Sequence, residues 1–228
     1  MENRNQFIKD FNNYIDKFLN LNGKDWKEVL KENVLKPDSN NWEWFAELCL
    51  LQKKYGYDFD MFGTYLEEKK MTNTGLGQFF TPMHIAKLMS CLNFPSDIQD
   101  ILDSKYITVS DPCCGSGRFM IAHSDEAQSK FKQFWTPTTF NYVNVDLDHN
   151  SYIYTALNAV LRNLYSINIH GNSLTLKIYG AIITAPNTSG LSNWNSNVNL
   201  DKIKKILEEP LERNMKKKKT ENVNMTLF

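Results

Sequence analysis

Hydrophobic residues follow a helical spacing through the first seventy residues of this 228-residue chain. Apolar side chains recur every three to four positions, which predicts amphipathic helices that each bury one face. Gly23 and Pro37 end the first two stretches, and Ser39 or Asn40 is expected to cap the third. The apolar positions are Phe7, Phe11, Tyr14, Ile15, Phe18, Leu19, Trp26, Val29, Leu30, Val34, Trp42, Phe45, Leu48, Cys49 and Leu51. Residues 1–70 are therefore predicted to form a helical bundle with an aromatic core.

Short β-branched runs alternate with helical stretches in the second half of the chain. The helical stretches begin at Arg118 and Asp148 and separate three of the runs from one another. Alternation of this kind is typical of α/β folds in which helices flank a mostly parallel sheet. The runs expected to be strands are residues 106–110, 140–146, 166–170 and 180–184.

The turn after the first of these runs is the best candidate for a binding site. Asp111-Pro112-Cys113-Cys114-Gly115-Ser116-Gly117 connects a strand to a helix and carries two glycines. Such a turn exposes backbone N–H groups at a helix start, where a ligand can approach the main chain closely. The carboxylate of Asp111 favours a cationic or hydroxyl-bearing ligand over a phosphate. No Gly-Lys-Ser/Thr follows, so the turn is not a phosphate loop.

Three further features lie along the same half of the chain. Thr81 and Pro82 are expected to be the N-cap and the first residue of a helix. Asp146 ends the second run, a position from which a carboxylate commonly binds ribose hydroxyls in doubly wound folds. Asp148 is expected to cap the helix that follows. Asn172 can both donate and accept hydrogen bonds, which suits the edge of an adenine.

Composition narrows the class of protein. The formal net charge is zero, so no global field attracts the chain to DNA. The four cysteines have no metal-ligand spacing, which favours reduced thiols in a cytosolic protein and no metal site. No apolar run is long enough to span a bilayer, and the first residues do not open a signal peptide. The chain is therefore expected to be cytoplasmic, without a membrane partner.

The heptapeptide at 111–117 resembles the S-adenosylmethionine (SAM) loop of adenine-N6 DNA methyltransferases, in particular the modification subunits of type I restriction systems. Gly77-Gln78-Phe79-Phe80-Thr81-Pro82 is similar to the family's N-terminal SAM motif, and 171–174 to its Gly-Asn-x-Leu motif. The resemblance implies a Rossmann-like SAM-dependent methyltransferase domain over residues 71–198. It implies SAM as cofactor, bound by Gln78, Phe79, Phe80, Thr81, Asp111, Cys113, Gly115, Ser116, Gly117, Asp146, Leu147, Asn172 and Ala185.

The resemblance fails at the motif that binds the acceptor adenine. Active members of the family carry Asn (or Asp)-Pro-Pro-aromatic after the fourth strand, where this chain has Ala185-Pro186-Asn187-Thr188. Ala185 cannot accept a hydrogen bond from the amine, and Thr188 has no ring to stack on a flipped base. Losing one aligned acceptor typically slows such a reaction by about a hundredfold or more. Pro186 and Asn187 remain the only catalytic candidates, as a degenerate motif.

Residues 199–228 are predicted to hold one amphipathic helix and a basic tail. The sheet is expected to be truncated, with an edge covered by a partner, by a second copy of the chain or by that helix. The last five residues resemble the sliding-clamp binding peptide of bacteria, with Leu227 and Phe228 as its apolar pair. A Leu-Phe pair of this kind suits an apolar groove on a partner; packing on the chain's own domain is the alternative.

Three functions stay open at this point. The first is a SAM-binding protein without methyl transfer that acts as regulator, decoy or accessory subunit in a restriction-modification or DNA-replication assembly, a setting typical of mobile elements. The second is an active adenine-N6 methyltransferase that a modification or specificity subunit completes, with DNA contacted through that partner. The third is an interaction module whose pocket is filled by Phe79, Phe80 or Arg118.

Overall fold

The computed structural model describes residues 2–19, 21–38, 41–71, 80–94, 107–131, 139–205 and 225–226. The chain divides into two compact units, Met1–Phe80 and Thr81–Phe228. All four cysteines are free thiols. In the part of the chain that the structure describes, no helix combines the length and apolarity needed to cross a membrane.

The first unit is a bundle of helices around an aromatic core. Its helices are α1 (Glu2–Tyr14), extended by a π-helical turn (Ile15–Leu19), α2 (Trp26–Leu35), α3 (Glu43–Tyr55) and α4 (Met61–Glu68). Phe11 is fully buried, and its ring lies 4.5 Å from that of Tyr65 and 6.0 Å, edge-on, from that of Phe62. The predicted helical, aromatic-cored region is confirmed. The cap of α3 is corrected, because Trp42 occupies the N-cap position and no side chain caps the helix.

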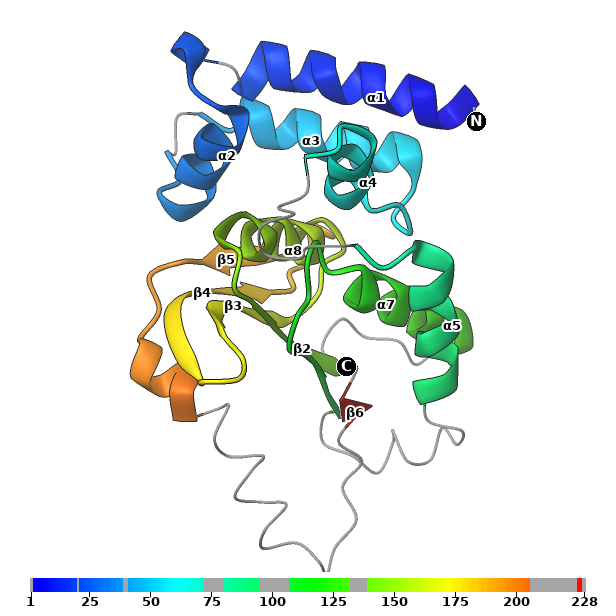
Figure 1. Cartoon of the computed structure of the whole chain (residues 1–228), viewed down its shortest axis with the longest axis vertical. Helices are drawn as coiled ribbons and strands as arrows, with labels where there is room; N and C mark the ends of the chain where they lie inside the picture. The colour runs from blue at the N-terminus through cyan, green and yellow to red at the C-terminus, as the bar shows by residue number, and fades with distance from the viewer. Residues whose placement is uncertain are drawn as a thin grey trace, which may run out of the picture. The chain divides into compact units, whose positions relative to one another are not determined.

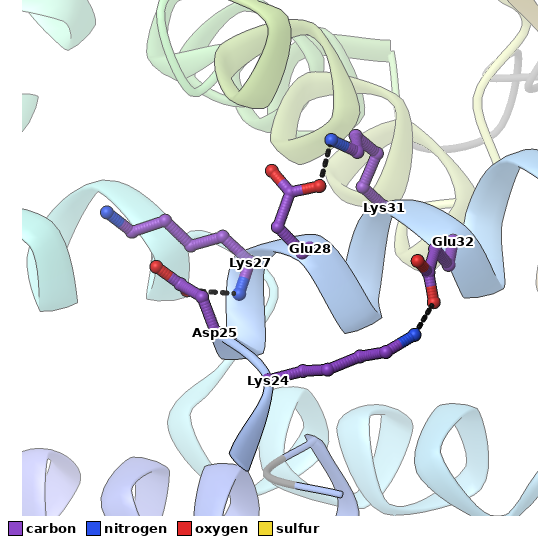
Figure 2. Close-up of polar contacts among 6 residues, drawn as sticks. All are labelled: Lys24, Asp25, Lys27, Glu28, Lys31 and Glu32. Carbon is purple, nitrogen blue, oxygen red and sulfur yellow. Dashed lines mark hydrogen bonds and ion pairs between the residues drawn. The ribbon is translucent and has the colours of Figure 1, made fainter. Parts of the chain in front are cut away.

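Charged side chains of α2 and the residues just before it form a cap and two ion pairs (Figure 2). Asp25 caps the helix by accepting the Lys27 N–H at 2.8 Å, and Lys24 pairs with Glu32 at 2.9 Å. Lys31 pairs with Glu28 one turn along the same helix. Because the Lys24–Glu32 and Lys31–Glu28 pairs are at least partly exposed to solvent, each adds less than about 1 kcal/mol to stability.

The second unit is built on a six-stranded sheet with the order β5-β4-β3-β2-β1-β6 (Figure 1). Strands β1 (Ile107–Asp111), β2 (Phe140–Asp146) and β3 (Ser166–Asn172) are parallel. They are connected by α7 (Arg118–Phe131) and α8 (His149–Leu161), and α5 (Met83–Asn93) packs beside α7. The predicted α/β class with a mostly parallel central sheet is confirmed for these three strands.

Two apolar cores cover the two faces of the sheet. Strand residues of one face pack with α7, α8 and Phe94, through Ile107, Val109, Met120, Ala127, Phe131, Phe140, Tyr142, Ala159 and Leu164. On the other face Val143, Val145, Ile167, Ile169 and Ala181 pack with Ile203 of the helical segment at 200–205. The sheet is therefore buried on both sides, as parallel sheets generally are.

Strand β4 (Lys177–Ala185) is antiparallel to β3, so the mostly parallel sheet expected from the sequence does not extend to the fourth strand. Only the four-residue turn 173–176 separates β3 from β4, and a parallel connection needs a dozen residues or more. Thr184 fixes the register, because its hydroxyl accepts the Ser166 N–H at 3.1 Å and donates to the Leu164 carbonyl oxygen at 2.8 Å. Gly171 is required at the start of this hairpin, because a Cβ there would lie 2.7 Å from the Lys177 carbonyl oxygen.

The outermost strands complete the sheet on either side. β5 (Asn193–Asn195) continues the hairpin antiparallel to β4. On the opposite edge β6 (Met225–Thr226) runs parallel to β1, with Met225 opposite Val109 and Thr226 opposite Ser110. Among the described residues, β6 is thus the neighbour of β1 on the side away from β2. The predicted clamp-binding pair, Leu227 and Phe228, lies outside the described residues.

Candidate cofactor-binding site

The loop after β1 forms as a tight turn with two left-handed glycines. Gly115 has φ +56° and Gly117 has φ +85°, values that favour glycine over other residues. A Cβ on Gly117 would also lie 3.0 Å from Cγ2 of Thr155. The Gly117 N–H donates to the Cys114 carbonyl oxygen at 2.8 Å, and α7 begins at the next residue. The predicted strand–loop–helix geometry of residues 107–123 is confirmed.

Helix α8 holds this loop through side chains that the sequence reasoning missed. The Thr155 hydroxyl donates to the Gly115 carbonyl oxygen at 2.9 Å, and the Asn158 amide donates to the Ser116 carbonyl oxygen at 2.7 Å. Arg162 in turn donates to both oxygens of Asn158, at 2.9 and 3.0 Å. These three polar residues are buried at spacings of three and four along α8 and its C-cap, among mainly apolar positions. That pattern is the signal from which a polar support for the loop could have been expected.

Asp111 is a buried carboxylate with one oxygen left for a ligand. The side chain is 2 % exposed. Its Oδ1 accepts the Cys113 N–H at 3.1 Å, whereas the buried Oδ2 has no hydrogen-bond partner. Burial raises the pKa of Asp111 to about 7, with a smaller contribution from the nearby Asp146. An unsatisfied buried acceptor is costly to leave unpaired, so this atom suits a cationic donor on a ligand.

Asp146 ends β2 beside the loop, as predicted. Its Oδ2 accepts the Gly115 N–H at 2.7 Å and its Oδ1 accepts the Asp148 N–H at 2.8 Å. These bonds fix the carboxylate and leave further lone pairs for hydroxyl donors. Burial raises the pKa of Asp146, and its backbone hydrogen bonds oppose that rise. Leu147 follows at 47 % exposure, and His170 of β3 donates to its carbonyl oxygen at 3.2 Å. Asp148 caps α8 as predicted, since it accepts the Ser151 N–H at 2.8 Å.

The N-terminal motif meets the loop through Arg118. Gln78 and Phe79 lie outside the described residues, and Phe80 is largely buried. The Arg118 guanidinium donates to the Thr81 carbonyl oxygen at 2.9 Å. Among the described residues no ion pair joins Arg118 to Asp111. The predicted cap is corrected by one position: Pro82, with ψ 139°, is the N-cap of α5 and no side chain caps the helix.

Asn172 lies at the carboxyl end of β3 but is used by the β3–β4 turn. Its Oδ1 accepts the N–H groups of Leu174 and Thr175, both at 3.0 Å. Two acceptor bonds to the backbone are typical of side chains that organise a turn. The side-chain N–H donors remain for a ligand edge, so the structure does not test the predicted contact with adenine.

The predicted catalytic residues Pro186 and Asn187 follow the carboxyl end of β4, which lies beside the amino end of β3. They are therefore at the end of the strands opposite to the binding loop, and the expectation that they belong to the same site as that loop is corrected. Gly180 pairs with His170 at the level of Asp146, and Ala185 follows five residues further along β4. At about 3.4 Å per residue, Ala185 lies roughly 17 Å along β4 from the level of Asp146, and Pro186 and Asn187 follow after the strand has ended. Asn187 organises the β4–β5 turn there, accepting the Ser189 N–H and exchanging two hydrogen bonds with Asn163.

The remaining site residues converge at the carboxyl ends of β1 and β2. They comprise a glycine cradle, an unpaired buried acceptor on Asp111 and a fixed carboxylate on Asp146, with the start of α5 held beside the loop by Arg118. A ligand with both a cationic group and a ribose fits these groups. The strand order and this site define a Rossmann-like SAM-dependent methyltransferase domain. Within that class the chain belongs to the N-6 DNA Methylase family, which it matches over residues 58–198, more than half of its length.

The solved structures include one similar chain. It is described as a class I S-adenosylmethionine-dependent methyltransferase from Listeria monocytogenes, with 13 % sequence identity and a TM-score of 0.36. The similarity covers 71 % of this chain and 52 % of that chain, so the present chain spans about half the length of its neighbour. No curated protein matches the sequence. The family match confirms SAM as the cofactor expected from the sequence.

Proposed function

We propose that this protein binds SAM and acts in DNA methylation or restriction through a protein partner, without transferring the methyl group by itself. When bound, SAM supplies an electrophilic methyl group. The observation that carries the proposal is the direction of β4, which takes Ala185, Pro186 and Asn187 away from the loop at 111–117. The cofactor half of a methyltransferase site is present in the described residues, whereas the predicted acceptor motif lies at the wrong edge of the sheet.

Each residue at the loop has a role in this proposal. Asp111 Oδ2 accepts a hydrogen bond from the ammonium of the methionine part, and Asp146 accepts from the ribose hydroxyls. The resemblance of residues 77–82 to the family's N-terminal SAM motif implies that the start of α5 binds the methionine carboxylate. The absence of a side-chain cap supports this role, because helix N-termini favour anions. Cys113, Gly115, Ser116 and Gly117 contribute main-chain contact rather than side-chain chemistry.

Two measurements test the proposal. Isothermal calorimetry of the whole chain with SAM is expected to give one site per chain, and Asp111→Ala is expected to abolish the heat. Transfer of tritiated methyl groups to DNA is expected to stay at background for the chain alone. An absence of SAM binding at millimolar ligand contradicts the first half, and Asp111-dependent incorporation by the chain alone contradicts the second.

An active enzyme completed by a partner is the second candidate, and the edge of β1 favours it. The described residues of β6 pair with only two of the five residues of β1, so much of this edge can accept another strand. A modification or specificity subunit that contributes such a strand would bring DNA and an acceptor site to the loop. Incorporation that requires the partner and is lost in Asp111→Ala would select this candidate over a decoy or regulator.

A sliding clamp or a second copy of the chain is the alternative partner. The resemblance of residues 224–228 to a clamp-binding peptide supports the clamp, with Leu227 and Phe228 as the residues bound. Pairing of Met225 and Thr226 with β1 would compete with that binding, since the same backbone cannot form both contacts. Pull-down on the purified clamp by wild type and by a Leu227→Ala, Phe228→Ala variant separates this partner from a methyltransferase subunit.

A further inference from the structure

Arg118 is a buried cation whose cost must be offset by specific contacts. It is the first residue of α7, directly after the left-handed Gly117, and its side chain is 5 % exposed. Burying a guanidinium is unfavourable unless it is hydrogen-bonded, so its direction in the structure is informative. The side chain does not pair with the neighbouring Asp111, whose free oxygen stays without a partner. It contacts the main chain of a segment 37 residues earlier.

The contact is a hydrogen bond to the last peptide before α5. Arg118 Nη1 donates to the Thr81 carbonyl oxygen at 2.9 Å, and Pro82 is the N-cap of α5. Pro82 cannot donate a backbone hydrogen bond, and no side chain caps the helix. Within the described residues, Arg118 is therefore the side chain that ties the start of α5 to the loop at 111–117.

The geometry points to Arg118 as a positioning residue that selects for the amino-acid tail of the cofactor. This inference rests on the proposed function and adds the part of the ligand that one residue controls. By fixing the Thr81 peptide, Arg118 holds the free N–H groups at the start of α5 beside the loop at 111–117. Those N–H groups serve the methionine carboxylate, whereas the nucleoside part lies against Asp146 and Leu147. Loss of Arg118 should therefore affect ligands that carry the tail and spare ligands that lack it.

The test compares two ligands on the whole chain. SAM carries the methionine tail, and 5′-methylthioadenosine is the same thionucleoside without it. Arg118→Met is expected to weaken SAM about tenfold or more, as expected for one hydrogen bond to a charged group, and to change 5′-methylthioadenosine less than about threefold. Arg118→Lys keeps a charged donor on a long side chain and is expected to restore part of the SAM affinity, whereas Arg118→Gln, a shorter and neutral donor, is not.

Arg162→Met is the matched comparison. Arg162 is also a buried arginine, but it supports the loop through Asn158 and has no contact with the Thr81 peptide. It is expected to weaken both ligands by the same factor. Equal weakening of both ligands by Arg118→Met, or no weakening of either, would overturn the assignment. Should Arg118→Met unfold, the comparison of Arg118→Lys with Arg118→Gln decides in the same way.

Amide hydrogen exchange separates a failure of this inference from a failure of the proposed function. The first hydrogen-bonded amides of α5 are those of Ile85 and Ala86, which donate to the Pro82 carbonyl oxygen at 2.9 and 3.1 Å. Without ligand, Arg118→Met is expected to speed exchange at Ile85 and Ala86 about tenfold or more and to leave Val109 unchanged. If the wild type binds neither ligand, the proposed function fails, and the exchange result then tests the role of Arg118 by itself. Unchanged exchange at Ile85 and Ala86 would refute that role.

Discussion

Protonation of Asp111 is predicted to control cofactor affinity in the physiological pH range. The perturbation is a change of pH between 5.5 and 8.5, with Asp111→Asn as the variant that cannot titrate. Burial raises the pKa of Asp111 to about 7, so near neutral pH a large fraction of the free protein carries a neutral carboxyl group. A cationic ligand requires the charged form at Oδ2. Binding must therefore expel a proton whenever the pH lies below that pKa.

The size of the effect follows from this pKa. Relative to the fully ionised site, the apparent affinity falls by a factor of one plus ten to the power of the pKa minus the pH. With a pKa of about 7, ionisation of Asp111 alone makes affinity about tenfold lower at pH 6 than at pH 8, with about another tenfold lost per unit below that. The α-amino group of SAM itself loses its proton near pH 7.7–8.0, so the net difference between pH 6 and pH 8 is about fourfold and affinity falls again at higher pH. The profile is expected to be a bell whose acid limb belongs to Asp111.

Calorimetry measures both the affinity and the proton. Titrations at each pH in two buffers of different ionisation enthalpy give the number of protons released on binding. Near pH 6.5 that number is expected to be about three-quarters for the wild type and zero for Asp111→Asn, which should also bind weakly. Asp201→Asn removes an exposed, distant carboxylate and is the control expected to leave the profile unchanged. A flat acid limb in the wild type, or an acid limb that survives in Asp111→Asn, would refute the reasoning.

The raised pKa of Asp111 also predicts how the free energy of unfolding changes with pH. The folded pKa of Asp111 lies above the unfolded value of about 3.9. Between pH 4 and 7 the folded state thus binds more protons than the unfolded state, so the free energy of unfolding falls as pH rises through this window. Asp111→Asn should raise the free energy of unfolding by on the order of 2–4 kcal/mol at pH 8 and by almost nothing at pH 4.

Three further substitutions test the scaffold of the site. Gly117→Ala should lower the free energy of unfolding in urea by about 1 kcal/mol more than Gly190→Ala does. Both glycines have φ above +80°, but only at Gly117 would a Cβ meet Thr155. Equal losses would mean that the contact with Thr155 relaxes freely. Thr155→Val should lose about 1–2 kcal/mol and weaken SAM, and Thr155→Ser should retain both, since it keeps the donor to Gly115. Thr226→Pro should speed amide exchange in β1 whereas Thr226→Val should not, because proline cannot continue the ladder with Ser110; equal protection in the two variants would show that β6 does not cover β1.

Much of the cofactor site could be predicted because it depends on local chemistry. The left-handed turn at Gly115 and Gly117 needs glycine whatever surrounds it, and Asp148 caps α8 through its own next turn. The second strand ends at Asp146 in the structure as in the sequence pattern. The support from Thr155 and Asn158 was missed, because side chains forty residues from the loop meet it only after α8 packs on the sheet.

The expected direction of β4 is wrong, and this has the largest consequence for the site because β4 leads to Pro186 and Asn187. The hydrophobic pattern of a buried strand is the same in either direction, so residues 177–185 gave no sign of their orientation. The length of the connection between β3 and β4 does indicate the direction of β4. Four residues between His170-Gly171-Asn172 and Lys177 allow a hairpin and exclude a crossover helix. The resemblance to the family implies an acceptor site at Pro186 and Asn187, whereas the antiparallel hairpin directs these residues away from the loop at 111–117.

The edge of β1 away from β2 distinguishes the two proposed functions, a SAM-binding protein without methyl transfer and an enzyme completed by a partner. In an open α/β sheet, ligands bind outside the carboxyl ends of the strands where connections diverge on either side of one strand. Here β1 is that strand: α7 leads to β2 on one side, and the described neighbour on the other side is β6. Bringing residues 185–187 to the loop would require breaking the whole β3–β4 ladder, together with the Thr184 network.

Among the described residues, adding a strand at the edge of β1 requires displacement of the two β6 pairings. A partner that restores methyl transfer must therefore bind at β1 and expose β6, whereas a partner of a decoy or regulator has no such requirement. Loss of β1 protection by Thr226→Pro, combined with easier activation by the partner, is the pair of results that only the enzyme hypothesis predicts.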